Sequence, residues 1–284
     1  MNRSITNVCL LTVAMMATGT AWAQASTGPN KVYIEQIGNS NTVTIQQVGG
    51  TNNVGGTAVS TPTSVSASGI TTFTPAAPSS TNYATITGSS NTVALTQTGN
   101  GNSAQYDMQG SNNVYTSTVT GHSNMTSLTI GDSNNASNLR NTVTETITGD
   151  TNLIIQQLVG SDITSTTAIT GNLNQITKEL KSSNGTSDIE ITGNSNVLNI
   201  QQTDAAGANG HYLKQVIAGS FNSITTQQQG TNDTTVDIRA TGSNNTSLLE
   251  PAVAVLLHQA QLSRDKHNVA IAFSHAFNIN QYYH

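Results

Sequence analysis

The chain has 284 residues, of which only 8% are charged and 4% aromatic, and its formal net charge is −5 at pH 7. A soluble domain usually carries roughly 25% charged residues and more large apolar side chains, so the composition argues against a conventional globular core. The mildly acidic charge gives no reason to expect nucleic-acid binding. The many Val, Ile and Thr residues argue against disorder and favour β-structure.

The first 23 residues predict a signal peptide. Arg3 gives a positive start, residues 8–17 are apolar, and small residues form a cleavage site that ends at Ala23. A membrane anchor would need about 20 apolar residues, and polar residues interrupt this stretch. Cleavage removes Cys9, the only cysteine. The mature chain, which begins with a short segment at 24–31, then has no thiolate metal site and no cysteine nucleophile.

Residues 32–53 contain one pattern twice. VYIEQIGNSN at 32–41 is followed by VTIQQVGGTN at 43–52, and a glycine, two further residues and an asparagine mark each unit. The marker begins at Gly38, Gly49, Gly88, Gly99, Gly110, Gly121, Gly131, Gly149, Gly171, Gly193, Gly219 and Gly242. Gly160 and Gly230 keep the spacing but are followed by Ile163 and Asp233. Such a persistent unit of about eleven residues should dominate the fold.

Side chains alternate between the markers. The apolar or amide sets are Val43, Ile45, Gln47; Val93, Leu95, Gln97; Ala104, Tyr106, Met108; Ile154, Gln156, Leu158; and Leu198, Ile200, Gln202. A period of two predicts strands that direct these sets to one face, while the Thr-rich other face is solvated. Glycine suits a tight turn with φ > 0, and asparagine tolerates the left-handed region there.

Two units form a rung of about 22 residues, which cannot bury its own apolar face and must stack on others. The sequence therefore predicts an all-β, cross-β-like parallel β-solenoid of strand-turn-strand rungs that rise about 4.8 Å each. Inward Gln and Asn side chains would stack as ladders. The first repeats occupy 32–53, and the main solenoid occupies 84–249.

Two segments depart from the repeat. Residues 54–83 contain Pro62, Pro75 and Pro78, and proline cannot donate to a β-ladder, so we expect a surface loop or a linker between the first repeats and the main solenoid. The divergent tail at 250–284 could cap the stack, contact a partner or form degenerate final rungs. Its histidines, His258, His267, His275 and His284, match no compact metal-ligand spacing.

The pattern Ile34-x-Gln36-x-Gly38-x-x-Asn41-x-Val43-x-Ile45-x-Gln47-x-Gly49-x-x-Asn52 resembles the curlin repeat of bacterial functional amyloid. The likeness returns around 93–102, 196–202 and 222–230. It implies a secreted subunit of curli-like amyloid fibres, which polymerises by end-to-end β-strand stacking. These fibres would form a fimbrium on the surface of a Gram-negative bacterium and support adhesion and biofilm.

The resemblance also implies partners and site residues. The partners would be further copies of the chain, a nucleator subunit and an outer-membrane curli-type secretion channel, with no nucleic acid. The family's amide ladder maps onto Gln36, Asn41, Gln47, Asn52, Asn91, Gln97, Asn102, Asn196, Gln202, Asn222 and Gln228. Its turn glycines map onto the marker glycines, Gly160 and Gly230 included.

Two other functions deserve comparison. No nucleophile elbow, zincin motif or phosphate loop occurs, and the acidic residues are expected mainly in turns or on the outward face, so we predict no enzyme, no catalytic residue, no metal and no cofactor. The alternative is a monomeric surface adhesin or ice-binding solenoid that uses its Thr-rich outer face. Thr-x-Thr steps begin at Thr42, Thr85, Thr116 and Thr142, but their phases in the repeat differ, so no single array is expected.

Overall fold

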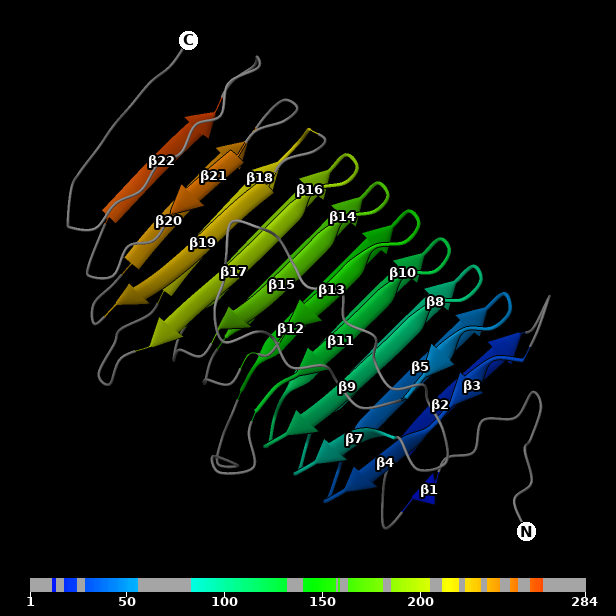
Figure 1. The fold of residues 1–284 in the computed structure, drawn as a ribbon. Helices are drawn as coiled ribbons and strands as arrows, with labels where there is room; N and C mark the ends of the chain where they lie inside the picture. The colour runs from blue at the N-terminus through cyan, green and yellow to red at the C-terminus, as the bar shows by residue number, and fades with distance from the viewer. Residues whose placement is uncertain are drawn as a thin grey trace.

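The computed structural model describes residues 12–13, 18–24, 29–55, 83–131, 140–156, 158, 163–180, 185–204, 211–219, 223–230, 234–240, 246–249 and 256–262. The regular structure of these residues is all β, and Figure 1 shows their strands following one another along a single stack. Among the same residues, no helix has the length and apolar character needed to cross a membrane.

The strands form two sheets. Sheet A contains β1 (Thr12–Val13), β3 (Lys31–Val32), β4 (Ile34–Ile37), β6 (Asn53–Val54), β7 (Ala84–Thr87), β9 (Ser103–Gln109), β11 (Met125–Thr129), β13 (Leu153–Gln156), β15 (Gln175–Leu180), β17 (Val197–Asp204), β19 (Ser223–Gly230) and β21 (Thr246–Leu249). Sheet B contains β2 (Thr18–Gln24), β5 (Thr42–Val48), β8 (Thr92–Thr98), β10 (Val114–Thr120), β12 (Thr142–Thr148), β14 (Thr164–Thr170), β16 (Thr186–Thr192), β18 (His211–Ile217), β20 (Thr234–Ala240) and β22 (Leu256–Leu262).

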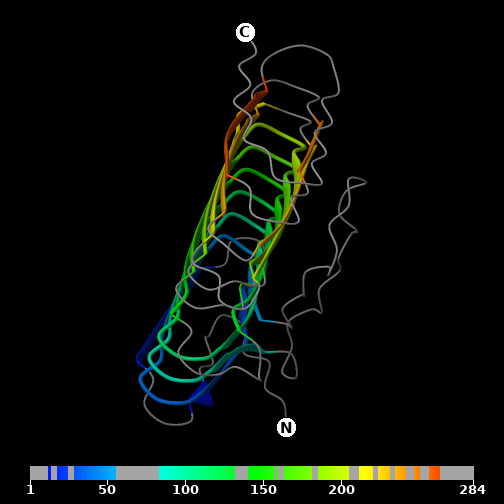
Figure 2. The ribbon, with the colours of Figure 1, turned by 90° about the vertical axis from the view of Figure 1, so that its left-hand side faces the viewer.

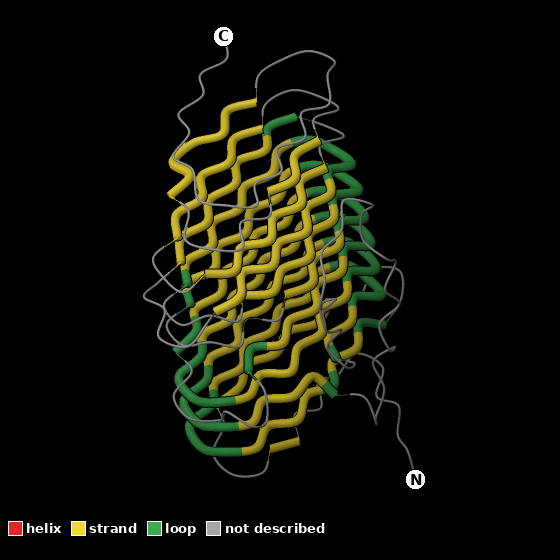
Figure 3. The backbone as a smooth tube through the Cα atoms, turned by 60° about the vertical axis from the view of Figure 1, so that its left-hand side comes forward, coloured by secondary structure: helices red, strands yellow, loops and turns green. Residues whose placement is uncertain are grey.

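Every strand pairing is parallel, and the chain alternates between the sheets. One rung is a strand of sheet A, a turn and a strand of sheet B, and a second turn leads to the next rung. Within sheet B, β10 lies between β8 and β12 and is in register with both over seven positions. Figure 2 shows the rungs stacked as a narrow column, and Figure 3 shows the turns lined up along its edges. This arrangement confirms the predicted parallel β-solenoid.

The segment predicted as a loop or linker interrupts one strand. Lys31 and Val32 of β3 pair with β6, while Ile34 of β4 pairs with β7. β6 and β7 then both pair with the single strand β9. The chain therefore leaves a rung after Gly55 and re-enters the same rung at Tyr83, so the first repeats and the main solenoid belong to one continuous stack. Residues 56–82 lie outside the described part of the chain.

Part of the predicted signal peptide extends the stack at one end. β2 pairs with β5 over seven positions, from Thr18 beside Thr42 to Gln24 beside Val48. β1 pairs with β4. Cleavage after Ala23 would remove β1 and nearly all of β2, which would leave β4 and β5 as the terminal rung.

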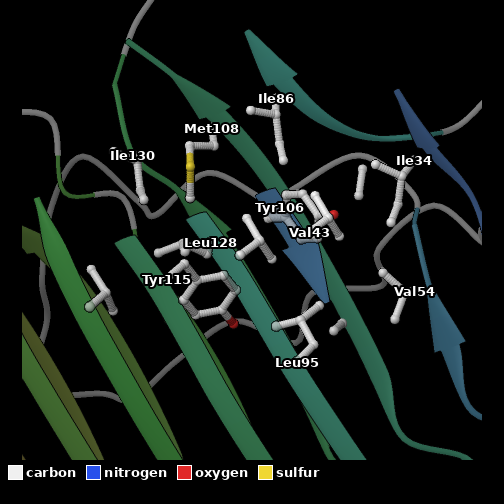
Figure 4. Close-up of a cluster of buried hydrophobic side chains, with 14 of the residues drawn as sticks. Ile34, Val43, Val54, Ile86, Leu95, Tyr106, Met108, Tyr115, Leu128 and Ile130 are labelled. Carbon is white, nitrogen blue, oxygen red and sulfur yellow. The ribbon is translucent and has the colours of Figure 1, made fainter. Parts of the chain in front are cut away.

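The core lies between the two sheets, and the alternating sets predicted to face inward are buried wherever their side chains are described. Figure 4 shows Tyr106 and Tyr115 in the apolar cluster near the first rungs. Their rings meet edge to face with centroids 6.3 Å apart. A second cluster, rich in isoleucine, includes Ile147, Ile169 and Ile191 and continues along the stack.

The two outward faces differ. On sheet B, Thr142, Thr146 and Thr148 are exposed, as predicted. On sheet A, a column of outward-parity residues is buried, so the expectation that this whole face is solvated is wrong there. The column consists of Gln105, Ser127, Ile155 and Thr177.

Threonines gather on the outward face of sheet B, although the Thr-x-Thr steps differ in phase as expected. The Thr85 step belongs to sheet A, and the other steps belong to sheet B. There the steps at Thr42 and Thr142 are in register, whereas the step at Thr116 is offset by two residues because Val114 pairs with Thr142. Thr116 lies beside Thr144, which lies beside Thr166. On β5, β8, β10, β12 and β14 the outward positions that are not threonine are Gln46, Val48, Ala94, Val114 and Ala168. The array therefore carries no charge across these five strands.

Candidate functional site: the amide ladders and the rung turns

Each intact turn has a glycine at its first position and an asparagine at its fourth. The glycine adopts a φ open to few other residues, for example 114° at Gly99. The left-handed residue is the third one, such as Ser40 or Thr51 with φ 58°, and not the asparagine as we expected. Asparagine instead follows the turn and directs its side chain into the stack.

The first glycine is required by contact as well as by φ. A Cβ built on Gly99 would lie 2.0 Å from the carbonyl oxygen of Gly121 in the next rung. Turns stack this closely because their backbones pair: Gly121 N–H donates to Thr98 O at 2.9 Å. The same short approach recurs at Gly38, Gly49, Gly88, Gly121, Gly149 and Gly171.

We name the longer run of asparagines the first ladder; it follows the turns that lead from sheet B to sheet A. Its members are Asn30, Asn52, Asn102, Asn124, Asn152, Asn174 and Asn196. All are buried in the stack. Since successive members lie one rung apart, their separation of 22 residues is the rung length wherever no extra segment intervenes.

Asn124 illustrates how a ladder residue connects three rungs. Its Nδ2 donates to Oδ1 of Asn102 at 3.1 Å and to the carbonyl of Gly149 at 2.7 Å. Its Oδ1 accepts from the backbone N–H and from Nδ2 of Asn152, at 2.9 and 3.0 Å. The bonds between successive ladder asparagines all run in the same sense, from the later residue to the earlier one, whereas the bond to Gly149 runs the other way. The asparagine ladder itself therefore has one donor end and one acceptor end.

The second ladder follows the turns that lead from sheet A to sheet B, and it is shorter. It consists of Asn41, Asn91, Asn113 and Asn141. At the next rung the position is filled by Ile163, which is buried, and then by Gly185. The Oδ1 atom of Asn141 is buried without a hydrogen-bond partner, which marks the end of this ladder.

A third set of side chains stacks outside the first ladder, at the second position of the same turns. Asn100 accepts from Gly50 N–H at 2.8 Å, and Nδ1 of His122 accepts from Asn100 N–H at 3.0 Å. Asp150 then accepts from His122 N–H at 2.7 Å. Asn172 and Asn194 continue the series. In these bonds the earlier rung donates to the later one, which is opposite to the bonds between the asparagines of the first ladder. Each of these turns is therefore hydrogen-bonded to its neighbours by donors that point both ways along the stack.

Among the side chains that the structure describes, the predicted glutamine ladder is confined to one pair. Nε2 of Gln47 donates to Oε1 of Gln97 at 2.9 Å. The next residue in that column is Val119, and Gln36 lies beside Ile86, so neither glutamine column continues. Both amide atoms of Gln36 are buried without a hydrogen-bond partner.

The remaining predicted residues fall as follows. Gln202 of β17 and Gln228 of β19 are register partners, but their side chains are not among those described. Three further predicted residues lie entirely outside the described part of the chain: Gly160, Asn222 and Gly242. Gly219 accepts from Nδ2 of Asn196 at 3.1 Å. Gly230 is the last residue of strand β19, and the three residues after it lie outside the described part of the chain. Gly131 is buried after β11, and the ladder continues at Asn141, not at the asparagine of its marker.

Asn30 is a ladder residue that the sequence analysis missed. Its Oδ1 accepts from Asn52 N–H at 2.9 Å, and its Nδ2 donates to the Gly49 carbonyl at 3.1 Å. The signal was present, because Asn30 stands two residues before Val32 and four before Ile34, as Asn41 stands before Val43 and Ile45.

A buried ionic network was missed as well, and its carboxylate, Glu145, is an exception to the expectation that acidic residues lie mainly in turns or on the outward face. Glu145 and Lys178 are both 0% exposed. The alternation could have revealed them: if Thr144 and Thr146 point outward, Glu145 points inward. The network occupies the middle of the rungs, where Glu145 on β12 projects between the sheets toward residues of β13 and β15.

Neutral side chains connect the two charged groups. Nζ of Lys178 donates to Oγ of Ser165 at 2.5 Å, and Ser165 donates to Oε1 of Gln156 at 3.2 Å. Nε2 of Gln156 donates to one oxygen of Glu145, and Tyr115 donates to the other at 2.8 Å. Lys178 also donates to Thr167 at 3.0 Å. Five strands contribute to this network: β10 and β12–β15.

Burial governs the titration of these groups. It raises the pKa of Glu145, and the hydrogen bonds from Tyr115 and Gln156 oppose that rise. It lowers the pKa of Lys178 to about 7, against the attraction of Glu145 and Asp188. Burial, followed by the charge of Glu145, raises the pKa of Tyr115, so its hydroxyl stays protonated. Within the described ranges, no three His, Cys, Asp or Glu side chains gather as metal ligands would.

Fold and ladders together define a class: a two-sheet parallel β-solenoid whose rungs are tied by asparagine ladders. Comparison of the chain with protein-family models, with curated proteins and with solved structures finds no match.

Proposed function

We propose that this chain is a secreted structural subunit that polymerises end to end into curli-like extracellular fibres supporting adhesion and biofilm. The observation that carries the proposal is the polarity of the first ladder, because a stack with a donor end and an acceptor end is complementary to another copy of itself. Such a head-to-tail contact does not close, so it generates a filament.

The terminal rungs support the same proposal. Removal of residues 1–23 would uncover the free edges of β4 and β5, whose other edges pair with β7 and β8. An uncovered edge presents unpaired N–H and C=O groups, which template further strands. The mature chain carries eight basic and fourteen acidic residues, a formal charge of −6, over a long stack, so repulsion between copies is modest.

The proposal is tested by incubating purified residues 24–284 and following thioflavin T fluorescence, then recording fibre diffraction. We expect fibres with a meridional reflection at about 4.7–4.8 Å. A chain that stays monomeric for days, without that reflection, would contradict the proposal.

Replacing Gln47 and Asn52 with alanine should slow assembly more than replacing Thr42 and Thr44 does. Gln47 and Asn52 are buried and bond to the next rung, whereas Thr44 is exposed on sheet B. A buried partner left unbonded costs about 1–3 kcal/mol, while an exposed threonine costs little. The readout is the thioflavin T lag time, and equal lags for the two double variants would remove the ladder from the assembly mechanism.

A second candidate function is favoured by the threonine array of sheet B. The array is uncharged and in register over five strands, which are spaced about 4.8 Å apart as in any sheet. Regular rows of methyl and hydroxyl groups on a rigid, flat sheet suit an ordered water lattice such as ice. Thermal hysteresis by monomeric protein that forms no fibres would favour this ice-binding function over the fibre.

A further inference from the structure

We propose that the interior network of Tyr115, Glu145, Gln156, Ser165 and Lys178 makes the solenoid pH-responsive, with its middle rungs least stable near neutral pH, where the carboxylate and the ammonium are both charged. The proposal concerns folding of the stack and does not depend on fibre formation.

The network is placed where charge is most costly. The two charged groups are fully buried and lie among apolar residues: Val143 of the first cluster and Ile147 of the second flank Glu145 on its own strand. Removing two ions from water usually costs more than their mutual attraction returns, unless further bonds compensate. Here the connection between them runs through Ser165 and Gln156, which are neutral.

Among the residues that the structure describes, few other titratable groups face the network. Tyr115 on β10 remains a neutral donor, and β11, β13 and β14 contribute the uncharged Thr126, Gln156, Ser165 and Thr167. Asp188 on β16 attracts Lys178, but it is half-buried on the outward face and forms an ion pair with Lys214 at 3.1 Å. The charge state of the interior therefore depends on Glu145 and Lys178.

The direction of the pH effect follows from proton linkage. The pKa of Lys178 is lowered from 10.5 to about 7, so over that window the unfolded state holds a proton that the folded state lacks, and stability rises with pH. The pKa of Glu145 is raised from 4.5, so above 4.5 and up to its folded pKa the folded state holds the extra proton, and stability rises as pH falls. The two effects together place a minimum of folding stability between the pH range over which Glu145 titrates and the range over which Lys178 titrates.

The test is urea unfolding of residues 24–284, followed by circular dichroism at low concentration, at about pH 5, 7 and 9, which spans the usual stability maximum of proteins at about pH 5–8. We expect a lower midpoint near pH 7 than on either side. Well inside the pH range between the folded and unfolded pKa of either group, the unfolding equilibrium constant should change by about tenfold per pH unit.

If the network acts as proposed, the urea midpoint of the two single variants should change with pH in opposite directions. Lys178→Met leaves only the carboxylate, so its midpoint should rise as the pH falls. Glu145→Gln leaves only the amine, so its midpoint should rise with pH. The double variant should lose the minimum, whereas the control Asp188→Asn with Lys214→Met, which removes the surface pair, should retain it.

Either of two results would overturn the proposal: a wild-type profile without a minimum near neutrality, or a minimum that persists in the double variant. If the variants do not fold, amide hydrogen exchange of the wild-type chain as a function of pH tests the proposal instead. Protection of the β12–β15 amides should then be weakest near neutral pH relative to β5 and β8, and pH-independent relative protection would reject the proposal.

Discussion

Gly99→Ser is expected to prevent the stack from forming around its turn. Gly99 has a φ of 114°, and a Cβ there would lie 2.0 Å from the Gly121 carbonyl oxygen. The strained backbone costs about 1–3 kcal/mol, and separating the rungs loses neighbouring hydrogen bonds worth about 0.5–1.5 kcal/mol each. The total, roughly 4 kcal/mol or more from these terms, approaches the whole stability of many proteins. Urea unfolding of the mature chain measures it.

Gly101→Ser in the same turn is the matched control. Gly101 has a φ of 70°, and the nearest atom to its Cβ would be 3.6 Å away. Serine already occupies the equivalent position at Ser90 and Ser123, with φ 59° and 55°. The substitution should therefore cost no more than about 1–2 kcal/mol. Equal losses at Gly99 and Gly101 would show that the rungs do not approach each other at their turns as described.

Asn113→Ser should destabilise the solenoid far more than Asn112→Ser. Asn113 is buried, and its Oδ1 accepts from the backbone N–H and Nδ2 of Asn141 at 3.1 and 3.2 Å. The shorter serine leaves both donors buried and unbonded, at about 1–3 kcal/mol each. Asn112 is exposed with φ 61°, a position that serine occupies in other turns, so its replacement should cost less than about 1 kcal/mol.

The two variants differ by a single position and share the same change of side chain. Thermal or urea unfolding, with amide exchange at Asn141 as a local readout, distinguishes them. If Asn112→Ser proves as damaging as Asn113→Ser, the second ladder is not what stabilises this edge.

The fold was predictable because the repeat carries two independent signals. Alternation assigned Val43, Ile45 and Tyr106 to the interior, and a marker of fixed length required a turn after every strand. Parallel stacking followed because a single rung cannot cover its own apolar face. Both signals, the alternation and the marker, involve residues that are close together in the chain, so they can be recognised from the sequence alone.

What the sequence concealed depends on which residues become neighbours one rung away. The Gln47 column joins Gln47 to Gln97 across an insertion, 50 residues apart, and ends because Val119 lies one rung after Gln97. Linear spacing also conceals a threonine column of sheet B: 28 residues separate Thr116 from its neighbour Thr144, whereas 22 separate Thr144 from Thr166. A three-dimensional register is required before a column can be identified.

The ionic network was concealed for a different reason. Strict alternation directs Glu145 inward, whereas a carboxylate is rarely buried unless it is paired. Its partner Lys178 comes from the opposite sheet, 33 positions later in the chain, and only the pairing of β13 with β15 brings it to Glu145 through Gln156. Buried charges are tolerated when such partners exist, and sequence spacing did not reveal them.

The most direct test of the central claim is solid-state NMR on fibres grown from isotope-labelled protein diluted into an excess of unlabelled protein. The stacked-rung structure predicts contacts between Asn102 and Asn124, and between Asn152 and Asn174, within one molecule, so these cross-peaks should survive dilution. If they vanish on dilution while each residue contacts its own equivalent in neighbouring molecules, the chain is not a solenoid of successive rungs.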